Sequence, residues 1–541
     1  MPRLGHAAGR SRTAMLKFKV YNPQHDSDTP DTPDSPGAPV ADPTLRNAYL
    51  LDSEGNGVRC EFSFQDGELW CDKRETGTAA LALQHPAGDL GELTLQTCLL
   101  PEREEPYLLS VELARHRLMT VYNKLEDWAM FELEASHPVS KREQRARSKF
   151  IEALCHQKED PARASRLADE SLAASLDGSE ELALAHSELL LNRRKESGSL
   201  PRAPLGCGVA LDERGPALRS AAAAHFDYVQ LPLPWKHLSP EENAYRWDDA
   251  DDWVAWAQAQ RKPVLAGPVI SFEPACLPDW LYIWEHDYDT VRDLVYEHIE
   301  QVVKRYQSSV SAWTIVSGLH VNRHFTFNFE QLMDLTRMSC MLVKKLDPAA
   351  KVVIELRQPF GEYYARNARS IPPMMYVDLL IQSAIAFDAF GLRLPLGQAV
   401  DGQHARDLMQ VSSVLDQFAG FGKNLFVTVA APSAPVTHEM IASTETDEPA
   451  DDRAGYWRRP WSEVVQGHWL EAALQIAMSK PFVEAVAWQD LIDHPQMELP
   501  LAGLLDDDEQ SKAALRRLTY FRENLGLTGR GQDTPAAAAT P

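Results

Sequence analysis

The spacing of hydrophobic residues changes twice along this chain. Residues 45–135 contain short runs in which apolar and polar residues alternate, separated by Gly, Asp and Pro, which is typical of β-strands. Residues 139–197 instead place apolar side chains such as Phe150 and Leu154 at helical spacing. From about residue 203, strand-like and helix-like segments alternate. The pattern predicts a multidomain protein in which each part has its own fold class.

The first part predicts a β-sandwich over residues 15–136, of the carbohydrate-binding-module type, because it contains several short strands at regular spacing. Its last two predicted strands are YLLSVELA (107–114) and WAMFELEA (128–135). Residues 22–44, rich in Pro, Asp and Thr, predict a disordered loop because they cannot bury enough apolar surface. Residues 137–202 predict a helical connector of two or three helices.

The third part predicts a (β/α)8 TIM barrel over residues 203–527, because eight strands alternate with amphipathic helices. The predicted strands are 206–211, 226–233, 263–271, 310–317, 351–356, 388–394, 424–431 and 483–490. We expect residues 1–14 to be disordered or a mis-annotated start, with Met15 as the true start. We expect residues 528–541 to form a disordered tail.

The composition restricts which partners the protein can bind more than it restricts which fold the chain can adopt. The 541 residues carry a formal net charge of −24, which argues against binding to nucleic acid or to an anionic membrane surface. We find no secretory signal and no apolar run long enough to span a membrane. The seven cysteines are scattered without a CxxC pair, so the sequence predicts no zinc site, no cofactor and a reducing, cytoplasmic location.

Six landmarks in the third part occur in a recognisable order. They are Trp235 with SPEENAYRWDDADDW (239–253), LPDWL (277–281), RYQSSVSAWTIVS (305–317), DPAAK (347–351), the pair AW (487–488) followed by Asp493, and GLLDDDEQSKAAL (503–515). In order and spacing they resemble the corresponding segments of glycoside hydrolase family ten, the endo-β-1,4-xylanase family. The resemblance implies a TIM barrel that acts on β-linked polysaccharide by retaining hydrolysis.

The same resemblance locates two catalytic positions that have lost their glutamates. The acid/base glutamate at the end of strand four corresponds to Gly318, and the nucleophilic glutamate of strand seven corresponds to Val429. Retaining hydrolysis needs two carboxyl groups about 5–5.5 Å apart. Glycine has no side chain and valine has no nucleophilic atom, so this mechanism predicts an inactive barrel.

Other carboxylates lie near predicted strand ends. Glu273 after strand three and Glu355 on strand five are the candidates for a relocated catalytic pair, because function in such barrels lies at the carboxyl ends of the strands. The alternative is that both are solvated or paired with Arg357, Arg393 or Lys236.

Aromatic side chains supply a second signal for sugar binding, since their ring faces can stack on the apolar faces of sugars. Trp235, Trp280, Trp284 and Trp488 lie near predicted strand ends and are candidate substrate-binding residues. Asp493 is a further candidate, with a role in capping or bracing the barrel end as its alternative.

Three further features are weaker. His320 and His324 are four residues apart but have no third ligand nearby in the sequence, so we expect a surface or hydrogen-bonding role rather than a metal site. Gly206-Cys207-Gly208 lacks the rest of a dinucleotide motif and predicts close packing. The long segment 432–461 either covers the barrel mouth or is a solvated insertion.

Three functions therefore stay open. The residue chemistry favours a degenerate xylanase-type barrel that binds carbohydrate or a protein partner without hydrolysis. The first alternative is an active glycosidase of the endo-1,4-beta-xylanase class with relocated carboxylates at Glu273 and Glu355. The second is a structural or assembly scaffold, which predicts a large apolar surface on the sandwich or the helices.

Overall fold

The chain divides into two compact units, residues 1–181 and 182–541, which are described separately. The computed structural model describes residues 15–21, 45–65, 67–74, 76–201, 204–211, 216–367, 369–441 and 456–527. The predicted disordered start, loop and tail at 1–14, 22–44 and 528–541 lie outside the described residues.

The described strands of the first unit form two four-stranded sheets, ordered β4-β5-β1-β8 and β3-β2-β6-β7. Within them only the short β1–β8 pairing is parallel. The strands are β1 (Leu16–Lys19), β2 (Tyr49–Leu51), β3 (Gly57–Val58), β4 (Cys60–Gln65), β5 (Glu68–Lys73), β6 (Ala80–Pro86), β7 (Glu92–Gln96) and β8 (Tyr107–Leu108), with the short helix η1 (Gly88–Leu90) between β6 and β7. The sandwich arrangement and the domain limits stay predictions.

The expectation of strands at 107–114 and 128–135 is wrong beyond the two residues of β8. Helix α1 (Leu109–Asp127) follows β8 directly, and no strand covers 128–135. The run YLLSVELA satisfies a period of two, but Leu109 and Leu113 also begin a helical series that continues through Leu118 and Leu125, all four of them buried. The helical period decides the structure because it continues through the five turns of α1.

Helices α2 (Pro138–His156) and α3 (Pro161–Glu196) occupy most of the predicted connector. In the first unit α1, α2 and α3 pack together through Leu118, Ala146 and Ala174, with Tyr122 and Phe150 against this cluster. The small side chains of the two alanines let the helices approach closely. Helix α3 continues across the boundary into the second unit.

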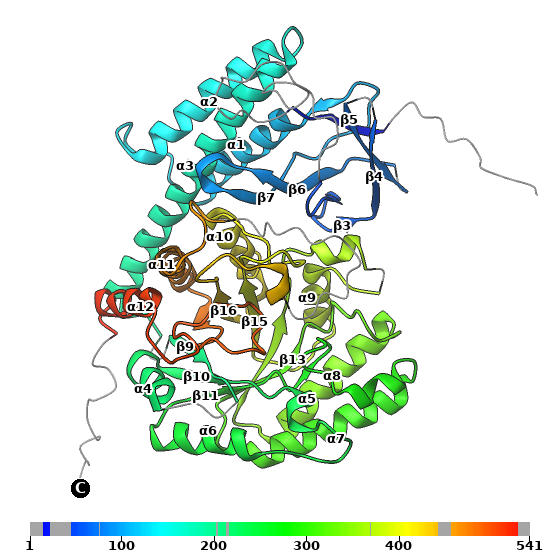
Figure 1. Ribbon diagram of the computed structural model, residues 1–541, viewed down its shortest axis with the longest axis vertical. Coiled ribbons are helices and arrows are strands. Elements are labelled where there is room, and N and C mark those ends of the chain that lie inside the picture. The colour runs from blue at the N-terminus through cyan, green and yellow to red at the C-terminus, as the bar shows by residue number, and fades with distance from the viewer. Residues whose placement is uncertain are drawn as a thin grey trace, which may run out of the picture. The chain divides into compact units, whose positions relative to one another are not determined.

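The second unit is a closed barrel, and all eight predicted strand positions are confirmed (Figure 1). Every ladder is parallel, and pairing of the first strand with the last closes the sheet through Gly206 and Ala487. The third position is split into two strands that both pair with the fourth. The strands are β9 (Leu205–Gly208), β10 (Tyr228–Leu231), β11 (Val264–Ala266) with β12 (Ile270–Ser271), β13 (Ala312–Ser317), β14 (Lys351–Leu356), β15 (Ala389–Pro395), β16 (Asn424–Ala430) and β17 (Val483–Trp488).

Inward-facing side chains fill the barrel. One buried cluster takes one residue from each of the second to seventh strand positions and two from the eighth: Tyr228, Leu265, Ala312, Val353, Ala389, Phe426, Ala485 and Ala487. The Tyr228 ring occupies the space over Gly206, where a Cβ would lie 2.3 Å from it. A Cβ on Gly208 would lie 1.8 Å from the Gln489 carbonyl oxygen. The predicted close packing at residues 206–208 is confirmed.

The barrel helices lie outside the strands (Figure 1). The α-helices are α4 (Pro216–His225), α5 (Trp235–Leu238), α6 (Asp248–Ala259), α7 (Tyr288–Tyr306), α8 (Phe329–Leu346), α9 (Pro373–Gln382), α10 (Leu408–Asp416), α11 (Glu463–Ser479) and α12 (Ala513–Asn524). The 3-10 helices are η2 (Asp279–Trp284), η3 (Glu362–Ala365), η4 (Ala419–Phe421) and η5 (His438–Met440). Among the described residues, no helix is both long and apolar enough to cross a bilayer.

One landmark pair has a structural explanation. Asp347 ends α8, and its carboxylate accepts a hydrogen bond of 3.0 Å from the indole N–H of Trp313 on β13. The bond satisfies a buried indole donor and connects α8 to the strand before it. The Trp and the Asp-Pro landmark are therefore parts of one contact.

His298 connects α7 to the barrel. Its ring stacks on Trp235 with centroids 4.3 Å apart, and its Nδ1 lies 3.0 Å from the Tyr245 hydroxyl oxygen. Complete burial lowers the pKa of His298 from 6.5 to about 3. The folded protein therefore keeps this ring neutral where the unfolded chain takes up a proton.

We predict that this histidine makes the protein acid-sensitive. Its stabilising contribution is complete above pH 6.5, the unfolded value, and is lost as the pH falls toward 3. When the pH falls from 7 to 4, the free energy of unfolding of the parent protein should therefore fall by about 3 kcal/mol more than that of His298→Phe. Urea unfolding at a series of pH values measures this difference, with His237→Phe at an exposed position as the control. Parallel pH curves for the His298→Phe variant and the parent would contradict it.

Candidate functional site

Glu355 lies inside the barrel near the carboxyl end of β14, 5% exposed. It is in register with Ser317 at the end of β13, and the Ser317 hydroxyl donates a hydrogen bond of 2.6 Å to Glu355 Oε1. The same oxygen accepts a bond of 3.1 Å from Nε of Arg393 on β15. Glu355 is therefore held by two donors on the neighbouring strands.

Arg357 follows β14 and connects this group to the other predicted carboxylate. Its Nε lies 3.4 Å from Glu273 Oε1. Its Nη2 donates a hydrogen bond to Glu498. The predicted alternative, in which Glu273 pairs with Arg357 and Glu355 pairs with Arg393, describes what the structure contains.

Glu498 joins the two arginines and is not among the site residues that the sequence predicts. Its Oε2 lies 3.3 Å from Arg393 Nη1, while Oε1 accepts from Arg357 and, at 3.0 Å, from the Gln403 amide. It comes from the segment between β17 and α12, well past the last strand. Its neighbours in the sequence, Met497 and Leu499, carry no chemical signal, so only the fold reveals it.

These five side chains form one network, which we name the mouth network: Glu273, Arg357, Glu498, Arg393 and Glu355. Burial alone would lower the pKa of Arg357, but the carboxylates of Glu498, Glu273 and Glu355 outweigh burial and raise it. For Arg393 burial again acts to lower the pKa, and Glu355 and Glu498 raise it above its ordinary value. Both guanidinium groups therefore stay charged, as such paired groups must when buried.

Gly318 lies against Arg357. Its φ is +64°, a left-handed conformation that favours glycine. A Cβ there would lie 2.7 Å from Cδ and 3.2 Å from Cγ of Arg357. The arginine side chain thus occupies the place where a side chain at residue 318 would begin.

Val429 is buried, 1% exposed, on β16 between Leu394 and Trp488 of the flanking strands. Its neighbour Thr428 is the polar residue here, and its hydroxyl accepts a bond of 3.0 Å from the Gln230 amide of β10. Residue 429 therefore contributes apolar packing.

The predicted aromatic residues do not form one cleft. Trp488 is 2% exposed and donates its indole N–H to the Ala502 carbonyl at 2.7 Å. Trp235 is 4% exposed and packs edge-on against Trp280, with centroids 5.7 Å apart. Trp280 and Trp284, both on η2, are partly exposed. Only these two of the four present accessible ring surface.

Asp493 braces the end of the barrel. Its Oδ1 accepts the backbone N–H of Gly503 at 2.7 Å, and its Oδ2 accepts from the Lys512 ammonium at 2.5 Å. These contacts connect the segment after β17 to the start of α12. They match the alternative role that the sequence suggested for this residue.

His320 and His324 lie in different surroundings. His320 is fully buried, its Nε2 is 3.0 Å from the Arg357 carbonyl oxygen, and burial lowers its pKa to about 4. His324 packs edge-on against Tyr282. Among the described residues, no group of three or more His, Cys, Asp or Glu side chains is placed to hold a metal ion.

The segment 432–461 is described in part, with residues 442–455 outside the described residues. Trp457 is 7% exposed and Trp461 is 4% exposed. Neither indole therefore presents an open face to a ligand.

Solved structures of xylanases are similar to this chain. The native xylanase 10B from Thermotoga maritima is 15% identical, with a TM-score of 0.45, and the alignment covers 60% of this chain and 96% of that one. A structure of GH10 from Paenibacillus barcinonensis is 17% identical, with a TM-score of 0.44 and coverage of 59% and 94%.

Curated relatives match over shorter stretches. The endo-1,4-beta-xylanase A of Xylanibacter ruminicola is 32% identical over 84 residues, 15% of this chain and 22% of that protein. The endo-1,4-beta-xylanase 3 of Hypocrea jecorina is 26% identical over 145 residues, 25% of this chain and 41% of that protein. The chain thus spans less than half the length of these relatives.

The family comparison covers the central part of the barrel. Residues 211–428 match the family model described as Glycosyl hydrolase family 10. The matched range contains Glu273, Gly318 and Glu355 and ends one residue before Val429. Within the barrel, residues 211–428 are therefore similar to glycosyl hydrolase family 10.

Proposed function

We propose that this protein binds carbohydrate through a degenerate xylanase-type barrel and does not hydrolyse it by the two-glutamate retaining mechanism. The position of Arg357 carries the proposal. Its side chain fills the space at Gly318, and its guanidinium pairs with Glu273 and Glu498. A group that donates a proton to a glycosidic oxygen cannot extend from residue 318 in this arrangement.

The relocated pair is disfavoured by the contacts of both candidates. A nucleophile must be able to reach an anomeric carbon, and an acid must be able to carry a proton. Glu355 is 5% exposed and accepts from both Ser317 and Arg393. Glu273 Oε1 lies 3.4 Å from Arg357 Nε, so its carboxylate is engaged in an ion pair.

The carbohydrate partner is supported by the relatives rather than by a bound ligand. The curated relatives are endo-1,4-beta-xylanases, and one similar solved structure, xylanase 10B from Thermotoga petrophila, is a complex with xylobiose. We propose a β-linked xylo-oligosaccharide or xylan segment as the ligand. The acidic net charge of −24 fits a neutral polysaccharide better than an anionic polymer.

Two features of the whole chain belong to the same proposal. The two four-stranded sheets of the first unit support a β-sandwich of the carbohydrate-binding-module type. All seven cysteines lie within the described residues and are free thiols, which supports a reducing, cytoplasmic location.

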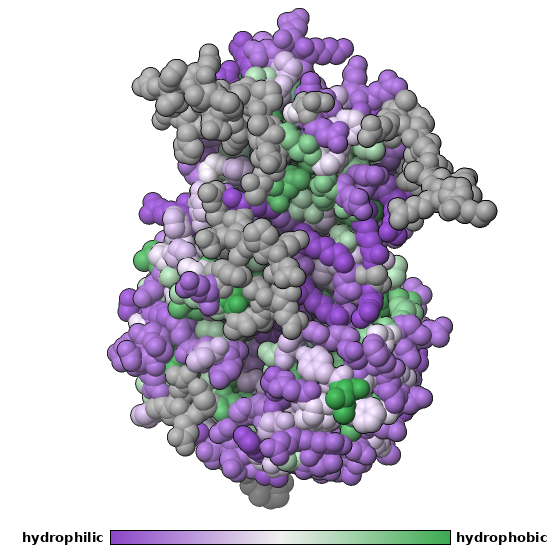
Figure 2. Space-filling view, turned by 45° about the vertical axis from the view of Figure 1, so that its right-hand side comes forward, coloured by the Kyte–Doolittle hydropathy of each residue, from purple (hydrophilic) through white to green (hydrophobic). Residues whose placement is uncertain are grey.

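The scaffold alternative rests on apolar surface. Ile151 and Leu154 on α2 are 54% and 37% exposed. The face of the barrel unit in Figure 2 is mostly hydrophilic, with small separate hydrophobic patches. Single exposed apolar residues are normal on soluble proteins, so we rank the scaffold second.

We predict no release of reducing sugar from xylan, and no cleavage of aryl β-xylosides or β-glucosides, above the level of the Glu273→Gln and Glu355→Gln variants. The reason is that both carboxylates are paired and residues 318 and 429 carry no carboxyl group. Calorimetric titration of the parent protein with xylohexaose should show binding. Turnover that either variant abolishes would contradict the proposal and establish a relocated pair.

We predict that Gly318→Ala destabilises the protein more than Gly198→Ala does, by about 1–2 kcal/mol. Both glycines have similar φ values, +64° and +66°, but a Cβ at 318 meets Arg357 while one at 198 meets nothing within 4 Å. Urea unfolding of the two variants isolates the contact with Arg357. Equal losses would show that the arginine side chain moves aside freely.

We predict that Glu498→Gln lowers the free energy of unfolding by about 3 kcal/mol, because it removes the one carboxylate that pairs with both guanidinium groups. Glu170→Gln is the control, since it removes an exposed partner of Lys149 and should cost less than about 1 kcal/mol. Losses of similar size would show that the mouth network is no stronger than a surface ion pair.

A further inference from the structure

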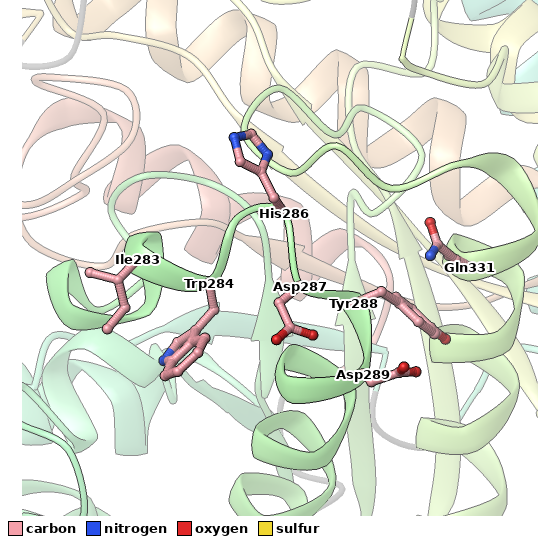
Figure 3. Close-up of a pocket in the computed structure, with 7 residues that line it drawn as sticks. All are labelled: Ile283, Trp284, His286, Asp287, Tyr288, Asp289 and Gln331. Atoms are coloured by element: carbon pink, nitrogen blue, oxygen red, sulfur yellow. The ribbon is translucent and has the colours of Figure 1, made fainter.

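A surface hollow of about 620 Å³ lies beside α7 and α8, and its lining shares no residue with the mouth network (Figure 3). Its lining residues are Ile283, Trp284, His286, Asp287, Tyr288, Asp289 and Gln331. The volume lies within the range of small-molecule sites, about 300–1,000 Å³.

The hollow is built from two neighbouring loops on the functional face of the barrel. Ile283 and Trp284 end η2, which follows β12, and Gln331 lies in the first turn of α8, which follows β13. Segments that follow the strands of a (β/α)8 barrel lie at its C-terminal face, where ligands bind. The hollow is thus placed where a barrel protein recognises ligands.

One side of the hollow is aromatic and apolar. In Figure 3 the side chains of Trp284 and Ile283 project from the same segment. Ile283 is 74% exposed and Trp284 is partly exposed. A partly exposed indole beside an exposed aliphatic side chain offers a flat surface on which the C–H face of a sugar ring can stack.

The other side supplies a hydrogen-bond donor and acceptor. The Gln331 side-chain oxygen accepts the Asn328 N–H at 2.9 Å, which leaves its NH₂ group available to donate. The Asp289 carboxylate is exposed in the first turn of α7 and can accept from hydroxyl groups. The Asp287 carboxylate already accepts from the Thr290 N–H and hydroxyl, so it fixes the helix end.

The charge of the lining residues selects among ligand classes. The seven lining residues include two aspartates and no lysine or arginine. A phosphate or uronate would meet repulsion from Asp287 and Asp289. A neutral ligand with many hydroxyl groups and an apolar face fits the indole, the carboxylate and the amide together.

We infer that this hollow is a binding site for a short neutral oligosaccharide, with Trp284 as the stacking surface and Asp289 and Gln331 as hydrogen-bonding partners. The inference rests on the proposed carbohydrate-binding function and names where that binding occurs. In this assignment the oligosaccharide binds at the hollow and not at the barrel mouth, where the mouth network holds the carboxylates.

Calorimetric titration of the full chain with xylohexaose tests this assignment. We expect Trp284→Ala to weaken binding at least tenfold, and Asp289→Ala, at an exposed position that leaves packing intact, to weaken it severalfold. Trp256→Ala is the matched control, because Trp256 is also partly exposed but lies on α6. Trp280→Ala tests the other accessible indole of η2.

The outcomes separate this site from the wider proposal. Loss of binding in Trp284→Ala and Asp289→Ala but not in Trp256→Ala supports the hollow. Full binding by both hollow variants, or loss only in Trp280→Ala, overturns the hollow and leaves the carbohydrate-binding function standing. Failure of the parent protein to bind xylohexaose overturns both.

Discussion

The pairing of Arg357 with carboxylates on two sides is the interaction on which the barrel mouth depends. A guanidinium held near Glu273 and Glu498 cannot leave without exposing buried charge of one sign. Its side chain consequently fills the space beside Gly318, where the lack of a Cβ leaves that space free and also allows the left-handed backbone. The absence of a side chain at residue 318 and the placement of Arg357 are thus two descriptions of the same contact.

The network also makes this end of the barrel polar while holding its carboxylates in ion pairs. Three carboxylates face two guanidinium groups, and Glu355 receives a further bond from Ser317. Buried ion pairs of this kind contribute little net stability compared with apolar packing but impose a definite geometry. A retaining glycosidase instead needs one carboxyl group protonated and one available to attack. Recognition of a ligand therefore fits better at an open surface such as the hollow beside Trp284.

Most of the barrel could be predicted from the sequence, because its strands are mostly apolar and alternate with helical segments, the pattern of a parallel sheet covered by helices. The secondary structure of the first unit was harder to predict from the sequence. YLLSVELA satisfies both a period of two and a helical period, and only the continuation through Leu118 and Leu125 decides for α1. Short ambiguous runs of this kind are decided by what their neighbours bury.

The sequence alone determined the eight barrel strands, the family landmarks and the absence of carboxyl groups at residues 318 and 429, since these are properties of residue type and spacing. The tertiary structure alone decided which charges meet. Glu498 lies 141 residues from Arg357 along the chain, and no local pattern marks it as a partner. The same holds for the hollow beside α7, whose residues come from two separate loops. Spacing predicts elements, but the closure of the barrel decides which loops become neighbours, and the charges at its mouth are a consequence of that closure.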